Sequence, residues 1–143
     1  MSAASAAIRS TNFTTTQATS ELRTTAGVLV RVFEVGLIQA TGTAQSLGLG
    51  RPAAQGVTPG TVTTFVRDAA NEPACVTTQN ASWATSPTVP VTFMRRWNSA
   101  ATIGVGIVWT FPRGGILVPV SASLVIWNIT TAVATDVNFA IDE

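Results

Sequence analysis

Short runs in which apolar and polar residues alternate recur along this chain, and this pattern restricts the fold more than any other feature. In the clearest run, residues 103–111, every second residue is apolar, while Gly104 and Gly106 leave the other face flat enough for close approach of another backbone. Similar runs cover 28–38, 62–67, 91–97, 124–130 and 137–142. A period of two residues is that of a half-buried β-strand, so the chain is predicted to be all-β.

The segments between these runs contain the residues that form turns. Residues 50–60 include two Pro and three Gly, which predicts a surface loop, and Pro112 is followed by Gly114 and Gly115 in another turn. Helix-forming periodicity is nearly absent. Eight or nine short strands separated by turns in one domain predict a β-sandwich or a β-barrel.

Charge is scarce in this chain. Its 143 residues suffice for one domain with a core, yet only 10% are charged and 46% are apolar. A monomer usually depends on a charged surface for solubility, so part of this surface is predicted to lie against partners. The net charge of +1 and the scattered Arg residues argue against nucleic acid as a partner. The chain contains no run of 18 apolar residues, so no membrane span is predicted.

The residue inventory removes most catalytic chemistry. The chain has no His and no Lys, and Cys75 is its single Cys, so His-based triads, Schiff bases and zinc ligation lack their side chains. Glu34 lies among Val and Phe residues in a predicted strand, where we expect it to pair with an Arg such as Arg31. We therefore predict no enzyme activity, no catalytic residues, no cofactor and no metal.

The most site-like cluster is Met94-Arg95-Arg96-Trp97. Arg and Trp are enriched in binding hot spots, and a strand would place Arg95 and Trp97 on one face. The alternative is a core Trp97 with both Arg residues in ion pairs. Trp83, in an irregular polar segment, is either an exposed anchor or a plug over one end of the sandwich.

The first 25 residues differ from the rest in composition. They are rich in Thr and Ser, and in residues 10–25 only Phe13 and Leu22 are sizeable apolar side chains. This composition fits either disorder or an extended arm that orders against a neighbouring subunit. We expect an N-terminal arm at 1–25, with Phe13 and Leu22 as contact residues, followed by the sandwich domain at 26–143.

Three segments carry a resemblance to a known class. Residues 103–112 and 114–128 resemble a jelly-roll protein of tailed bacteriophages, the second segment resembling the late hairpin of viral jelly rolls, and residues 48–60 resemble loops in such small virion proteins. The resemblance implies a jelly-roll-like antiparallel sandwich of about eight strands. It also implies a capsid cement (decoration) protein, a virion structural protein made in the host cytoplasm. Such proteins form homotrimers on the capsid surface and clamp adjacent major capsid protein subunits, often through an N-terminal arm.

A second class of function uses the same sandwich. A receptor- or carbohydrate-binding domain of a phage tail fibre would stack sugars on exposed Trp83 or Trp97. A tail or neck component of the same particle would differ from a cement protein only in symmetry and copy number.

Overall fold

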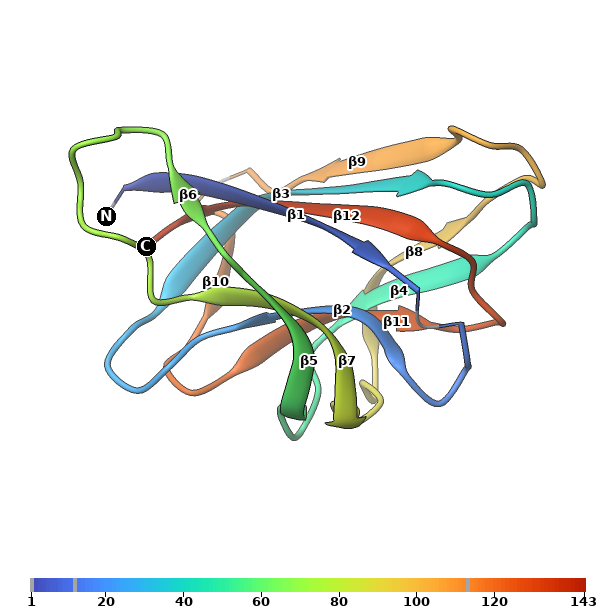
Figure 1. The fold of residues 1–143 in the computed structure, drawn as a ribbon, viewed down its shortest axis with the longest axis horizontal. Helices are drawn as coiled ribbons and strands as arrows, with labels where there is room; N and C mark the ends of the chain where they lie inside the picture. Colours follow the sequence, from blue (N-terminus) through green and yellow to red (C-terminus); the bar gives the residue numbers. More distant parts are fainter. Residues whose placement is uncertain (1, 12, 113) are drawn as a thin grey trace.

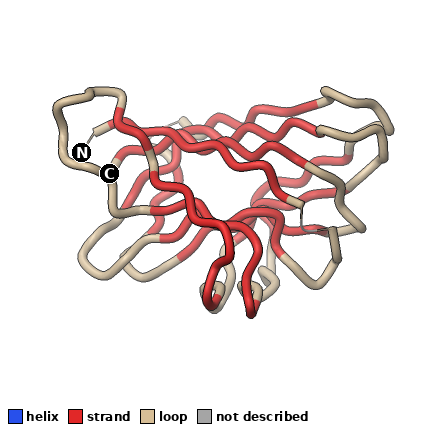
Figure 2. Tube along the Cα trace, viewed as in Figure 1, coloured by secondary structure: helices blue, strands red, loops and turns tan. Residues whose placement is uncertain are grey.

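The described residues of this chain form strands and no helix (Figures 1 and 2). The computed structural model describes residues 2–11, 13–112 and 114–143. Its strands are β1 (Ala3–Ser10), β2 (Ala18–Arg23), β3 (Val30–Gln39), β4 (Ser46–Gly50), β5 (Val57–Thr64), β6 (Val66–Arg67), β7 (Thr78–Thr85), β8 (Phe93–Asn98), β9 (Gly106–Thr110), β10 (Ile116–Val118), β11 (Ser123–Asn128) and β12 (Thr135–Asp142). The prediction of an all-β chain is confirmed.

The strands form two antiparallel sheets that pack face to face (Figure 1). Sheet A has the order β10-β3-β12-β1-β6, with β9 also paired to β3. Sheet B has the order β5-β7-β2-β11-β4-β8. The apolar inner faces of both sheets meet in one core, which includes Leu37 and Phe139 of sheet A and Leu22 and Ile126 of sheet B.

Eight of these strands follow a jelly-roll path. The chain alternates between the sheets, so β1 pairs with the last strand, β12, while β2 pairs with β11. Strands β3 and β4 then pair with the other sides of β12 and β11. Finally β8 joins β4, and β9 joins β3. The resulting orders, β1-β12-β3-β9 and β2-β11-β4-β8, are those of two interlocked Greek keys, and the predicted jelly-roll-like sandwich is confirmed.

The extra strands come mainly from one insertion between β4 and β8. Strands β5 and β7 form a hairpin that extends sheet B beside β2, and β6 pairs with β1 at the edge of sheet A. The predicted loop at 50–60 is therefore shorter than expected, because β5 begins at Val57 and includes Pro59 and Gly60. Pro is tolerated there because β5 is an edge strand.

The predicted boundary between an arm at 1–25 and a domain at 26–143 requires a correction. Strand β1 lies between β12 and β6, and β2 lies between β11 and β7, so both belong to the sandwich. Ala4, Ala6 and Ile8 point inward, and the small size of the two Ala residues conceals the alternation that marks a strand. Thr favours strands as well as loops, which is why Thr content alone did not separate an arm from a sheet.

The run at 103–111 forms a shorter strand than its alternation predicts. Ile103 is 70% exposed, and Gly104 has a φ of +80°, so both lie in the connection before β9. Gly106 begins the strand, and a Cβ there would lie 2.5 Å from the carbonyl oxygen of Leu37. The predicted close approach of another backbone is confirmed at this glycine.

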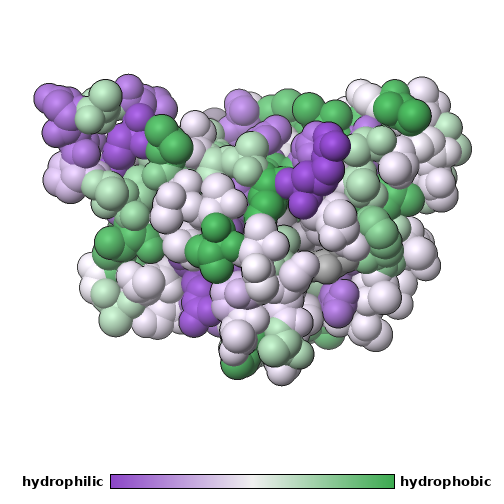
Figure 3. Space-filling view, viewed as in Figure 1, coloured by the Kyte–Doolittle hydropathy of each residue, from purple (hydrophilic) through white to green (hydrophobic). Residues whose placement is uncertain are grey.

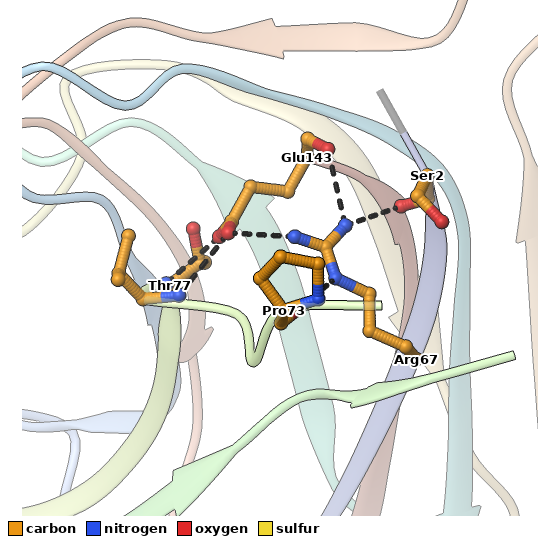
Figure 4. Close-up of polar contacts among 6 residues, drawn as sticks. Ser2, Arg67, Pro73, Thr77 and Glu143 are labelled. Carbon is orange, nitrogen blue, oxygen red and sulfur yellow. Dashed lines mark hydrogen bonds and ion pairs between the residues drawn. The ribbon is translucent and has the colours of Figure 1, made fainter. Parts of the chain in front are cut away.

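Both termini meet at one corner of the sandwich, around Arg67 and Glu143 (Figure 4). The Arg67 guanidinium donates to the Glu143 carboxylate at 3.2 Å and to the carbonyl oxygens of Ser2 and Glu143. The backbone N–H groups of Val76 and Thr77 donate to the same carboxylate. Burial alone would raise the pKa of Glu143, but the hydrogen bonds from Thr77 and Val76 and the charge of Arg67 outweigh it and lower that pKa.

Candidate functional site

Four connections between the sheets lie together at one end of the sandwich (right side of Figure 1). The register places them there, because Ser10 and Gln39 both pair with Thr135 and Ser46 pairs with Asn98. We call this surface the uncharged end, and it consists of residues 11, 13–17, 40–45, 99–105 and 129–134. These segments contain no Asp, Glu, Lys or Arg and consist mainly of Thr, Ala and Gly.

The uncharged end exposes apolar side chains. Ile103 is 70% exposed and Phe13 is 42% exposed. In Figure 3 the uncharged end, on the right, is pale to green, whereas hydrophilic residues gather at the opposite corner, where the termini lie. The free-energy cost of desolvation is low when a partner covers such a surface, because no charge is buried and the apolar groups leave water.

Buried Gln39 ties two of the four loops together. Its side-chain Nε2 donates to the carbonyl oxygens of Thr41 (2.6 Å), Ala100 (3.2 Å) and Thr102 (3.3 Å). Its Oε1 accepts a short hydrogen bond from the Ser99 hydroxyl. Because Gln39 is 1% exposed, these bonds do not compete with water.

Buried Gln45 acts in the same way on the 129–134 connection. Its Nε2 donates to the Thr135 hydroxyl at 2.9 Å, and its Oε1 accepts from the backbone N–H of Val133 at 3.0 Å. The Thr130 hydroxyl accepts from the backbone N–H of Ser46 at 2.8 Å. The 40–45 and 129–134 loops are thereby joined to each other.

Buried Asn128 holds the fourth connection, at residues 13–17. Its Nδ2 donates to the carbonyl oxygen of Thr14 at 2.9 Å, and its Oδ1 accepts from the Thr19 hydroxyl. The backbone N–H of Ala132 also donates to the carbonyl oxygen of Phe13. Three buried amides therefore pre-organise the uncharged end, so little loop ordering is needed when a partner binds.

Two shallow open depressions mark this end. The first lies between Thr43, Asn98 and Thr130, and the second lies between Phe13, Thr41 and Ala132. Their walls offer hydroxyls, amides and methyl groups. Such a surface can bind by burial and hydrogen bonding, because no group that titrates near neutral pH lines it.

Two of the predicted interface residues are in the core. Leu22 is 0% exposed and Trp97 is 8% exposed, and both belong to the main apolar cluster. The core alternative for Trp97 is therefore confirmed. Phe13 is the predicted residue that the structure places at the uncharged end.

Arg95 and Arg96 are exposed on the edge strand β8, away from the ion pairs expected for them. The Arg95 guanidinium lies 5.5 Å from the centre of the Phe111 ring, and that of Arg96 lies 5.9 Å from the centre of the Phe93 ring. The Arg95 contact joins β8 of sheet B to the residue that follows β9 of sheet A, whereas the Arg96 contact lies within β8. The ion pairs of the described residues are Arg9–Asp136 and Arg67–Glu143.

Trp83 lies on the outer face of sheet B beside buried Glu21. Its Nε1 donates to Glu21 Oε2 at 3.1 Å, while Ser123 and the backbone N–H of Gly56 donate to Oε1. Glu21 is 0% exposed. A Cβ on Gly56 would lie 2.3 Å from the Trp83 ring, so only Gly lets the 51–56 loop close over this site.

Glu34 is exposed on the outer face of sheet A and is absent from the two ion pairs of the described residues, so its expected pairing with an Arg is not observed.

Within the described part of the chain, no three His, Cys, Asp or Glu side chains are grouped to hold a metal ion. Cys75 is buried, and that burial raises the pKa of its thiol. No helix among the described residues is long and apolar enough to cross a membrane.

Sequence reasoning missed the three organising amides. Gln39 and Asn128 follow apolar runs, where a polar side chain suggests the end of a strand, and Gln45 follows small and polar residues typical of a loop, so none of the three suggested a buried amide that holds loops together. The absence of charge from all four loops was visible in the sequence, but it acquires meaning only once the four segments are known to be neighbours.

Searches of family models, of curated proteins and of solved structures give no significant match to this chain.

Proposed function

We propose that this protein is a virion structural subunit of the capsid cement (decoration) type, which bridges major capsid protein subunits on the surface of a phage head. The uncharged end carries the proposal. It joins four loops without charge, holds them with buried amides and exposes Ile103 and Phe13. A cement protein needs a surface of this kind, because it adds stability by burying area against a lattice and catalyses nothing.

The mode of attachment differs from the one implied by an N-terminal arm. Removal of residues 1–25 would delete β1 and β2, which are internal strands of both sheets. We therefore propose that the folded uncharged end, rather than a flexible arm, contacts the capsid. Several copies on one lattice would then combine modest individual contacts through effective concentration. The homotrimer implied by the resemblance stays a prediction.

The glycan-binding alternative has lost its main supporting residues. Trp97 is in the core, and the Trp83 ring packs beneath Gly56 with its N–H on Glu21. Neither ring is a free stacking platform for a sugar, so no observation favours this second function.

Co-sedimentation with purified phage heads that lack decoration tests the proposal. The unmodified protein should pellet with heads, and Ile103→Asp should weaken this binding at least about tenfold, because a charge would be buried against the lattice. Val91→Asp is the matched control, since Val91 is 99% exposed in the connection before β8, at the other end of the sandwich.

Both variants should keep the thermal unfolding midpoint of the unmodified protein, since each changes an exposed side chain. Failure of the unmodified protein to bind any head, or equal binding by the Ile103 variant, would overturn the proposal.

A further inference from the structure

The outward residues of sheet A form a regular grid in which small side chains alternate with larger apolar and charged ones. The strand register aligns its outward residues in four rows. The rows are Ala3–Asp142–Arg31–Leu117, Val66–Ser5–Ala140–Glu34–Thr110, Ala7–Asn138–Gly36–Val108 and Arg9–Asp136–Ile38–Gly106. We call these residues face A.

The charges of face A lie mainly in its two outer rows. Arg9 and Asp136 satisfy each other through two hydrogen bonds of 2.7 and 2.8 Å. The two middle rows contain one charge, Glu34. The large apolar side chains are exposed, with Val66 at 70% and Val108 at 58%. The middle of face A therefore carries little charge, with mainly small side chains between Val66 at one edge and Val108 at the other.

Face A has the size of a small, weak interface. Its four columns of residues, about 4.8 Å apart and about seven residues long, cover roughly 19 by 24 Å, or about 460 Å² per copy. Two such faces together would bury about 900 Å², which is in the range of weak, concentration-dependent association. Two sheets can pack face to face in this way when the strands of both are within about 30° of each other.

The charge pattern of face A is complementary to itself. A twofold axis that runs along the strands, between β3 and β12, places β12 of one copy against β3 of the other. Asp142 then meets Arg31 of the second copy, and this ion pair forms twice. The same operation sets Ala7 against Val108 and Ala3 against Leu117, so small residues face larger apolar ones.

The polar residues of face A are also accommodated by this arrangement. Glu34 faces Ala140 of the second copy, where the flanking Ser5 hydroxyl and Asn138 amide can donate to its carboxylate. Within one chain, Asp142 and Arg31 are cross-strand neighbours but take part in neither ion pair of the described residues. The Arg31 guanidinium donates through Nη1 to the carbonyl oxygen of Gly114 at 2.9 Å, and its other N–H groups can donate to a carboxylate of the second copy.

We propose that face A binds a second copy of this chain, as a twofold sheet-on-sheet dimer fixed by two Asp142–Arg31 pairs between copies. This inference concerns a surface other than the uncharged end and goes beyond the proposed function. It also specifies a twofold contact, which differs from the threefold contact of a homotrimer.

Two variants, each with one charge reversed, test the Asp142–Arg31 pairs between copies. Arg31→Asp and Asp142→Arg each place like charges opposite each other twice, so sedimentation velocity should show self-association weakened at least about 100-fold in either variant. An equimolar mixture of the two variants restores two attractive pairs and should form a heterodimer about as tightly as the unmodified protein dimerises. Pairing within one chain cannot produce this recovery on mixing.

A second variant tests the face without touching those charges. Val108→Glu should abolish the dimer, while the matched Val91→Glu should leave it intact, and circular dichroism should show both folded. A monomer at all concentrations, an oligomer that survives Val108→Glu, or a mixture that fails to associate would overturn the proposal. Head binding by Val108→Glu reports separately on the uncharged end, so either proposal can fail alone.

Discussion

The two outer faces of this sandwich are built from similar strands but end in different environments. On sheet B, Ala18, Val125 and Trp127 form an apolar cluster that Trp83 and Phe93 cover. On sheet A, the equivalent outward side chains, such as Ile38 and Val108, are 43% and 58% exposed. One face is covered by its own chain and the other is not.

The insertion between β4 and β8 explains this difference. The segments that lead into and out of it, residues 51–56 and 86–92, lie over sheet B and are joined by hydrogen bonds between Ala54 and Thr88. Ser86 accepts from the backbone N–H of Ala18, and Glu21 accepts from Gly56. In sheet A the insertion contributes only β6, at the edge. The insertion thus covers the outer face of sheet B and leaves the outer face of sheet A exposed.

The largest expected effect in this comparison comes from replacing one Glu by Leu on each face. Glu21→Leu leaves three buried donors, on Gly56, Trp83 and Ser123, without their acceptor, which should lower the free energy of unfolding by about 3–5 kcal/mol. Glu34→Leu is the same chemical change on exposed face A and should stay within about 0.5 kcal/mol. Urea denaturation at a dilute, monomeric concentration measures both, and equal effects would contradict the difference between the faces.

A smaller effect on stability is expected when one Val is shortened to Ala on each face. Val125→Ala, on the covered face, should cost about 1–3 kcal/mol, because Val125 is 0% exposed and the cavity cannot fill with water. Val108→Ala on face A should change the free energy of unfolding by less than about 0.5 kcal/mol in the monomer. The same Val108 variant should weaken self-association, which the Val125 variant leaves unaltered while folded.

Acid should loosen sheet A at the corner of the termini. The lowered pKa of Glu143 means that its contribution is complete above its unfolded value near 4.5 and is lost as pH falls through the lower folded value. Glu143→Gln should therefore cost about 1–2 kcal/mol at neutral pH and much less at pH values below the folded pKa.

Unfolding midpoints measured from neutral to acidic pH test this expectation. Exposed Glu72→Gln, in the adjoining 68–77 segment, is the matched control and should keep the acid sensitivity of the unmodified protein. A Glu143 variant whose loss of stability is the same at every pH would refute the linkage.

The smallest expected effect concerns the surface pair on face A. Asp136 has a lowered pKa, chiefly because Arg9 donates hydrogen bonds to it, but the Arg9 side chain is exposed in the monomer. At a dilute, monomeric concentration, Arg9→Gln should thus cause only a slight loss of stability at low salt and none that is measurable at high salt. A large, salt-independent loss in thermal denaturation would show that this end of face A is more constrained than its exposure indicates.

Much of the fold was predictable where large apolar residues alternate. Residues 124–130 and 137–142 form β11 and β12 close to their predicted limits, and these are central strands of both sheets. Strand β1 was missed because its inward residues are mainly Ala, which carries a weak strand signal. Of the predicted contact residues, Phe13 is exposed at the uncharged end, whereas Leu22 is a core residue. Trp97, for which a place in the core was the stated alternative, is also a core residue.

The sequence by itself determined the all-β fold class of this protein and which reactive side chains it contains. Alternation with period two, frequent turns and the absence of His and Lys are local or compositional properties, and each can be read from residues close together in the chain. Only the tertiary structure decided which apolar faces are covered and which four uncharged loops meet. Those properties depend on pairs far apart in sequence, such as Glu21 with Ser123 and Gln45 with Thr135, which local preference does not encode.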